Sequence, residues 1–199
     1  MINNKKDLNK YLEEDAMVNL GIKHLTTIQY IKYWIYGNES FRVVRLLRAL
    51  RYHEYYTNLC KREMFFLNKI LLRYYKIKHH RLEIKYGIKL GVNVLGYGVY
   101  IPHIRGGIIA DCRRIGNYCK LNNGVVIGRN HNIDNSPLIG DNVDVCVGSK
   151  IVRKVEIGNN VIVAPNSVVI DNIPDNCMVS GVPAKIIKFH NQKKSTNQN

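Results

Sequence analysis

Two of the seven histidines in this sequence lie in polar segments that interrupt apolar stretches. His103 occurs in IPHIRGG and His131 in GRNHNIDNSPL. An unperturbed imidazole has a pKa of about 6.5, so a positioned histidine suits general-base catalysis near neutral pH. These two are the candidates for a chemical or substrate-binding role. The others are interpreted as solvated or interhelical: His24, His53, His79, His80 and His190.

The five cysteines give no sign of a metal site. Their number is odd and none belongs to a CxxC pair, which argues against both zinc binding and a disulfide framework. Reduced thiols in a cytoplasmic protein are the simpler interpretation. We therefore predict that no metal is bound.

No segment of the sequence has the character of a signal peptide or a membrane span. The first residues, MINNKKDLNKYLEED, contain no apolar core, and no run reaches the roughly 18 apolar residues that span a bilayer. The sequence predicts a soluble, cytoplasmic protein that is at most peripheral to a membrane.

The region around His103 and His131 has a six-residue repeat. This period is typical of a parallel β-helix, in which three short strands form a triangular coil and each unit supplies one side and one corner. The aliphatic residue of each unit is predicted to point into the axial core, whereas a β-sandwich would alternate with period two. The repeated positions are Ile109, Ile115, Leu121 and Ile127, then Ile139, Val145, Ile151, Ile157, Val163 and Val169.

Polar residues between these positions are predicted to form the corners of the coil. Asn122-Asn123, Asp141-Asn142 and Asn159-Asn160 fall there. Short polar side chains satisfy nearby backbone groups and tolerate left-handed dihedral angles, which suits tight corners.

The repeat is interrupted twice. The spacing from Ile101 to Ile109 is eight residues, so HIRGG carries two extra, and the spacing from Ile127 to Ile139 is twelve. We expect residues 128–138 to form a loop that leaves the coil. Interruptions of a rigid solenoid are where function tends to be located.

The first part of the chain has helical spacing of apolar residues instead. Four helices are predicted: one from Asp7 to about Gly21, one opened by the capping box Thr26-Thr27-Ile28-Gln29 and closed at Gly37-Asn38, one from near Phe41, and one from about Asn58 to His79. We predict a helical domain over residues 1–84, a β-helix over 85–188 and a polar tail over 189–199.

The segments GYGVYIPHIRGGIIADCRRIGNYCKLNNGVVIG and IGDNVDVCVGSKIVRKVEIGNNVIVAPNSVVIDNIPDNCMVSGVPAKII resemble the hexapeptide-repeat acyltransferases. Within that family they look most similar to the serine acetyltransferase branch and its relatives in surface-polysaccharide gene clusters. The resemblance covers residues 85–188 and includes the closing GVPAK, Gly181 to Lys185. It implies an all-α N-terminal domain followed by a left-handed parallel β-helix.

The resemblance also implies a homotrimer with acetyl-CoA in the groove between neighbouring β-helices. A histidine removes the acceptor's proton, and the acceptor attacks the thioester without an acyl-enzyme. The matching histidine is His103, and Asn123 lies at the equivalent position one coil on, where it either binds the acceptor, orients the imidazole or forms a turn. Further acceptor-binding candidates are Arg105, Asn130 and His131.

Backbone groups at the corners are expected to bind the cofactor, as the resemblance implies. The matching positions are Gly128, Arg129, Val147, Gly148, Ala164 and Pro165, with Lys185 as a candidate for the 3′-phosphate or for a solvated surface.

The sequence departs from the serine acetyltransferases at the acceptor site. Ile88 stands where they have the aspartate that pairs with the histidine, and Asn135-Ser136 stand where they have an Arg-His pair before a proline, here Pro137. A carboxylate acceptor would lack its cation. We therefore favour a sugar hydroxyl of a bacterial surface polysaccharide or its precursor as acceptor. The alternatives are L-serine, an amino-sugar amine, and a scaffold subunit without enzymatic activity.

The net charge indicates an anionic partner. Thirty basic against fifteen acidic residues give +15. Arg42, Arg45, Arg48 and Arg51 recur every three residues, on a helix interpreted as packed with a solvated basic edge or as in contact with an anionic membrane. Nucleic acid is not predicted, because no recognition motif accompanies the charge.

Overall fold

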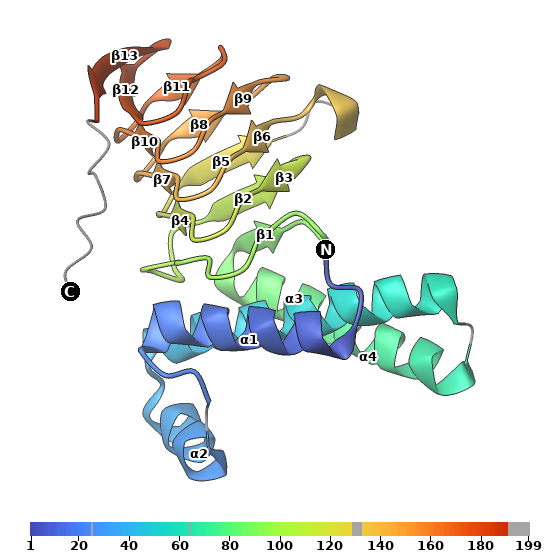
Figure 1. Ribbon diagram of the computed structural model, residues 1–199. Coiled ribbons are helices and arrows are strands. Elements are labelled where there is room, and N and C mark those ends of the chain that lie inside the picture. Colours follow the sequence, from blue (N-terminus) through green and yellow to red (C-terminus); the bar gives the residue numbers. More distant parts are fainter. Residues whose placement is uncertain (25, 64, 129–132, 191–199) are drawn as a thin grey trace, which may run out of the picture.

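The computed structural model describes residues 1–190 apart from residues 25, 64 and 129–132 (Figure 1). Helices form one end of the molecule, and short strands stack away from them toward the C-terminal end (Figure 1). The predicted order of a helical part followed by a parallel β-helix is confirmed.

Local capping interactions define the first two helices. The Asn4 side chain accepts from the Asp7 N–H at the start of α1 (Lys5–Leu20), which ends at Gly21 with φ 71°. Both hydrogen bonds of the predicted capping box are present at the start of α2 (Thr27–Tyr36). These bonds satisfy N–H groups that have no partner within a helix.

The boundary between the last two helices differs from the prediction. α3 (Glu39–Arg62) continues through Asn58, and α4 (Phe66–Tyr86) begins later and runs further than expected. The Asn58 side chain is buried and donates to the Ile2 carbonyl at 2.9 Å and to Asn93 Oδ1 at 3.0 Å. Asn58 therefore links α3 to the N-terminus and the first coil, and the sequence between α3 and α4 contains no glycine or proline that would have marked their boundary.

The strands form three faces of a triangular solenoid. The first face has the order β1 (Ile88–Leu90), β2 (Ile108–Asp111), β5 (Val125–Gly128), β8 (Lys150–Ile151) and β11 (Val168–Val169). The second face has β4 (Lys120–Leu121), β7 (Asp144–Val145), β10 (Ile162–Val163), β12 (Cys177–Gly181) and β13 (Ala184–Phe189). The third face has β3 (Arg114–Ile115), β6 (Leu138–Ile139) and β9 (Glu156–Ile157).

The axial core follows the six-residue repeat with one exception. Nine of the ten repeat positions are buried, but Ile109 is 42% exposed. In β2 the buried residues are Ile108 and Ala110, and Ala110 pairs with Ile127 one coil on. Because side chains alternate along a strand, a register displaced by one residue turns Ile109 outward. The predicted corner asparagines are confirmed at Asn142 and Asn160, whose φ angles are 56° and 55°.

A buried ionic cluster joins the helices to the first coil. The Arg51 Nε donates to Asp15 Oδ2 at 2.8 Å, and Nη1 donates to Glu54 Oε2 at 3.1 Å and to the Leu95 carbonyl at 3.0 Å. Burial alone would lower the pKa of Arg51, but the two carboxylates raise it overall. The expectation of a solvated arginine stripe is therefore wrong for Arg51, whose side chain is fully buried.

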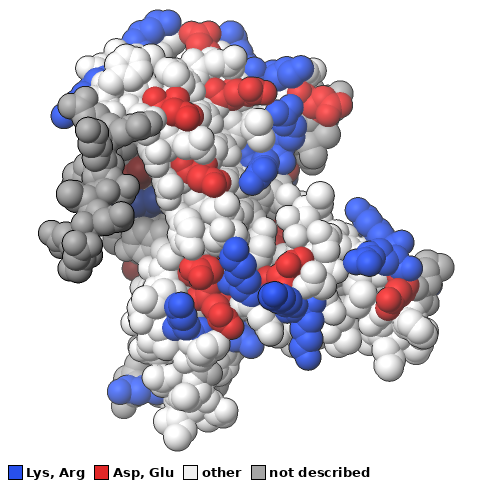
Figure 2. Space-filling model, in the orientation of Figure 1, with Lys and Arg blue, Asp and Glu red and all other residues white. Residues whose placement is uncertain are grey.

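Basic and acidic side chains are interspersed on the face shown in Figure 2, over both the β-helix and its helical base. Within the described residues, no helix has the length and apolar character needed to cross a bilayer.

Candidate active site

Most of the predicted site residues lie along one corner of the β-helix. In successive coils, residues 101–107, 122–124, 146–149 and 164–167 connect the second face to the first. Backbone hydrogen bonds stack these segments: Gly124 N–H donates to the Gly106 carbonyl at 3.0 Å, and Gly148 N–H to the Asn123 carbonyl at 2.8 Å. We call this the catalytic corner because the predicted base, His103, lies on it. The other predicted site residues that it brings together are Arg105, Asn123, Val147, Gly148, Ala164 and Pro165.

His103 is exposed at the end of this corner nearest the helices, where a carboxylate lies beside it. Its Nδ1 lies 3.7 Å from Oε2 of Glu39, the first residue of α3. The other carboxylate oxygen, Oε1, accepts from the Ile104 N–H at 3.1 Å. Ile101 and Ile104 are buried on either side of His103 and anchor the segment. Glu39 thus contacts both the imidazole and the backbone that carries it.

Sequence reasoning did not identify Glu39. It lies 65 positions from Ile104, and no periodicity or motif links the start of a helix to a corner of the β-helix. Ile88, at the position of the family's aspartate, is buried in β1 and pairs with Ile108.

α1 also positions the segment that leads to His103. The Asn19 side-chain amide donates to the Val99 carbonyl at 2.8 Å and accepts from the Ile101 N–H at 3.2 Å. Asp15 Oδ1 accepts from the Gly98 N–H at 2.8 Å. Both side chains are buried, so the helical domain determines where residues 98–104 lie.

Asn123 packs against the glycines that follow His103. A Cβ atom at Gly106 would lie 3.0 Å from Asn123 Nδ2, and the φ of 113° at this position is a backbone conformation that favours glycine. Asn123 Oδ1 is buried without a hydrogen-bond partner among the described residues. A buried acceptor of this kind is normally satisfied by water or a ligand.

Backbone N–H groups of the predicted cofactor residues on the catalytic corner already donate to carbonyl groups of neighbouring coils. Gly148 N–H donates to Asn123, and Ala164 N–H donates to the Val179 carbonyl at 2.9 Å. The side chains of Val147 and Pro165, on the same corner, are exposed. A ligand lying along this corner would therefore contact apolar side chains and carbonyl oxygens more than these N–H groups.

The other predicted residues lie elsewhere. Gly128 ends β5 at the next corner, and Lys185 on β13 is exposed, with its Nζ 3.4 Å from Asp171 Oδ2. Arg129, Asn130 and His131 lie outside the described residues.

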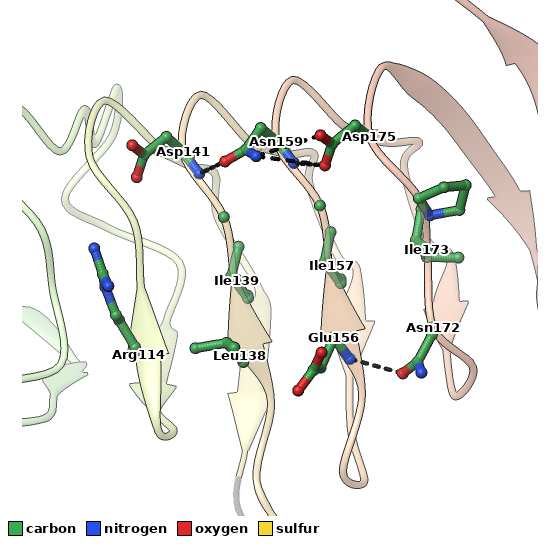
Figure 3. A pocket seen from close by; sticks show the side chains of 13 residues that line it. Arg114, Leu138, Ile139, Asp141, Glu156, Ile157, Asn159, Asn172, Ile173 and Asp175 are labelled. Carbon is green, nitrogen blue, oxygen red and sulfur yellow. Dashed lines mark hydrogen bonds between the residues drawn. The ribbon is translucent and has the colours of Figure 1, made fainter.

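A large groove on the third face is chemically different (Figure 3). Among the described residues that line it, three are carboxylates, Asp141, Glu156 and Asp175, and one is a cation, Arg114. The Asp141 N–H donates to Asn159 Oδ1 at 2.8 Å, and the Asn159 N–H donates to Asp175 Oδ1 at 2.7 Å, so these side chains hold successive corners together. A groove rich in carboxylates does not suit a ligand that carries phosphates.

No metal site is evident in the described parts of the chain. Within them, no three His, Cys, Asp or Glu residues are grouped so that they could hold an ion.

Comparison with known proteins finds no matching family model. The chain is similar to serine acetyltransferases of Buchnera aphidicola subsp. Acyrthosiphon pisum, with 26% identity over 199 residues, 95% of this chain and 64% of the relative. A second, from Synechococcus elongatus, is 34% identical over 95 residues, 47% of this chain and 39% of the relative. A third, from Staphylococcus epidermidis, is 34% identical over 109 residues, 54% of this chain and 49% of the relative. The chain thus spans less than two thirds of the length of these relatives.

Solved structures show the same fold. The serine acetyltransferase of Neisseria gonorrhoeae superimposes with a TM-score of 0.67 at 21% identity, covering 94% of this chain and 69% of that one. The enzyme of Vibrio cholerae gives 0.63 at 18% identity, covering 96% and 69%. A serine acetyltransferase in complex with CoA gives 0.58 at 19% identity, covering 92% and 71%. The predicted resemblance and the left-handed β-helix are confirmed, while the likeness to surface-polysaccharide enzymes stays a prediction.

Proposed function

We propose that this protein transfers an acetyl group from acetyl-CoA directly to a hydroxyl group, with His103 as the general base. The observation that carries the proposal is the contact of His103 Nδ1 with the Glu39 carboxylate on an exposed corner of the β-helix. The similarity to proteins named serine acetyltransferase supports the reaction class.

Glu39 and His103 have separate roles in proton transfer. The Glu39 carboxylate favours the tautomer with its proton on Nδ1, which leaves Nε2 to accept the proton of the acceptor hydroxyl. The resulting imidazolium is stabilised by the carboxylate beside it. The acceptor oxygen forms the new ester bond, the thioester C–S bond breaks, and the departing CoA sulfur takes the proton from Nε2.

Acetyl-CoA is proposed to lie along the catalytic corner. Val147 and Pro165 are exposed there in coils that follow His103, and the buried Asn123 Oδ1 has no hydrogen-bond partner among the described residues. The CoA complex of a solved relative with the same fold supports CoA as the acyl carrier. Lys185 and the homotrimer implied by the resemblance remain part of the proposal.

L-Serine is the acceptor to test first. The names of the similar proteins favour it over a sugar hydroxyl, which reverses the preference drawn from the sequence. The segment that suggested a sugar includes residues 129–132, which lie outside the described residues. Transfer to a sugar hydroxyl or to an amino sugar, and peripheral contact with an anionic membrane, stay predictions.

The test is an acetyl-transfer assay with the purified full chain. Thiol release from acetyl-CoA and the mass of the product would be measured with L-serine, a neutral sugar and an amino sugar. We expect His103→Ala to abolish transfer, while His80→Ala, an exposed histidine on α4, serves as the control. Near-normal kcat in His103→Ala would exclude His103 as the base. Absence of both transfer and CoA binding would favour the scaffold alternative.

A further inference from the structure

A pocket beside the catalytic corner gathers four cationic side chains. They come from three parts of the chain: Arg42 and Arg45 from the start of α3, Lys85 from the end of α4, and Arg105 from the segment after His103. The pocket has a volume of about 590 Å³. Its remaining lining residues are Tyr33, Gly37, Phe41 and Tyr86.

The charge of this pocket is unbalanced. No aspartate or glutamate is among its described lining residues, and none of the four cations forms an ion pair with a described carboxylate. Arg51, farther along α3, shows the contrasting arrangement, since it is buried against Asp15 and Glu54. Like charges that converge without counter-charges repel one another, and a bound anion would relieve that repulsion.

Packing against neighbouring residues fixes the positions of Arg42 and Arg45 in the pocket. Both arginines are half-buried, and Phe41, which belongs to α3 and packs against α2, is fully buried. A Cβ atom at Gly37 would lie 3.0 Å from Arg42 Nη2, so the guanidinium rests directly over the glycine that ends α2. Tyr33 stacks on Phe41 with ring centroids 5.7 Å apart.

His103 and Glu39 do not line this pocket, but close sequence neighbours of both do. Arg105 follows His103 by two positions, which places their Cα atoms at most about 7 Å apart. Arg42 follows Glu39 by one helical turn on α3, and Glu39 contacts His103. The pocket and the imidazole are therefore built on the same two segments, the start of α3 and residues 103–105.

We propose that this pocket binds the anionic group of the acceptor, a carboxylate or a phosphate, and so presents the acceptor's hydroxyl to His103. The inference rests on the acetyl transfer proposed above and names its acceptor class. Guanidinium groups bind both anions through paired hydrogen bonds. Asn135-Ser136 stand where the similar family has an Arg-His pair and so provide no positive charge for the acceptor. The four cations of the pocket would provide it instead.

Anion binding can be measured without acetyl transfer. Inorganic phosphate would be titrated calorimetrically into the full chain and into Arg45→Gln, with Arg81→Gln, an exposed arginine on α4 outside the pocket, as the matched control. We expect Arg45→Gln to weaken phosphate binding about tenfold or more and Arg81→Gln to leave it unchanged, as for the loss of a charge-assisted hydrogen bond. Equal weakening by both substitutions would show only general electrostatic attraction and would overturn the proposal.

Kinetics then identify the anion and its place in the reaction. Matched acceptors would be L-serine against L-serinamide, and glucose 1-phosphate against glucose. We expect the charged member of one pair to be preferred and its KM to rise about tenfold in Arg45→Gln, with the KM for acetyl-CoA unchanged. A rise in the KM for acetyl-CoA instead would assign the pocket to the cofactor and contradict the proposal.

The two proposals can fail separately. Phosphate binding that depends on Arg45, without transfer to any acceptor, would retain the anion site and refute the acetyl transfer. Transfer that is indifferent to Arg45 would retain the reaction and refute the pocket. Arg105→Gln, on the segment outside the helices, repeats the test if Arg45→Gln fails to fold, as judged by circular dichroism.

Discussion

The Glu39 carboxylate lies 3.7 Å from Nδ1 of His103, and the same carboxylate accepts a hydrogen bond from the N–H of Ile104. The first residue of a helix thus lies beside the imidazole and is hydrogen-bonded to the backbone that follows it. This contact joins the helical part to the β-helix at the point where the repeat is first interrupted.

Replacing the Glu39 carboxylate by an amide should lower kcat. In Glu39→Gln the side-chain oxygen would still accept from Ile104, but the charge that stabilises an imidazolium would be lost. We expect kcat to fall about 10- to 100-fold, as for other groups that orient a catalytic histidine, with little change in KM. Unchanged kcat would show that Glu39 only holds the backbone.

A methyl group at Gly106 should disturb the catalytic corner. Its φ of 113° is unfavourable for other residues, and the added Cβ would crowd Asn123. We expect Gly106→Ala to cost roughly 1–3 kcal/mol of stability and to reduce kcat. The matched control is Gly21→Ala, where φ is also positive but nothing lies within 4 Å, so that kcat should be unchanged. Denaturant unfolding and the transfer assay measure the two effects.

Removing the Arg51 charge should destabilise the protein strongly. Arg51→Met leaves Asp15 and Glu54 buried without their cation, which typically costs about 3–5 kcal/mol. Arg48→Met, at an exposed position of the same helix, should change stability by less than about 0.5 kcal/mol. Denaturation midpoints for the two variants provide the comparison. A similar small effect of both would mean that the cluster adds no net stability.

Acidification should destabilise the packing of α3 on α4. Burial, with smaller effects from His53 and His80, lowers the pKa of His79 to about 4. The folded state then binds fewer protons than the unfolded state, so stability is complete above about pH 6.5 and declines toward pH 4, by up to about 3 kcal/mol. The Nδ1 atom of His79 lies 3.3 Å from Nδ1 of His53, and its Nε2 atom lies 3.5 Å from Oε1 of Glu83.

The measurement is the free energy of unfolding of His79→Gln against the unsubstituted protein between pH 4 and 7. The variant should lose less stability on acidification, while His24→Gln, at an exposed position, should behave as the unsubstituted chain does. Identical pH profiles for all three proteins would show that His79 does not titrate in the folded state as inferred.

The fold was predictable because its cause is local and repeated. One aliphatic residue must fill each side of every coil, so aliphatic residues recur every six positions. Leu121, Val145 and Val163 are examples that stack in register in successive coils. The ends of α1 and α2 at glycines and the start of α2 at the capping box of Thr26 could be predicted because these signals are also local. Ile109 shows the limit, because a displacement of one residue at an interruption changes which side chain faces inward.

The candidate site was only partly predictable. His103 was predicted because it matches the histidine of the similar family and falls at an interruption, and Asn123 because it lies one coil on. The structure places both on one corner. The arginines from Arg42 to Arg51 read as a single stripe, yet Arg51 is buried in an ionic cluster while Arg42 and Arg45 line a pocket.

The repeat along the chain therefore determines the β-helix, because stacking requires similar residues at equal spacing, and its first interruption contains His103. The partners of that histidine come from the docking of the helices on the first coil. Glu39 reaches His103, and Arg42 and Lys85 share a pocket with Arg105, through helix packing that depends on contacts between residues far apart in the chain. No spacing records such contacts, so only the three-dimensional arrangement reveals them.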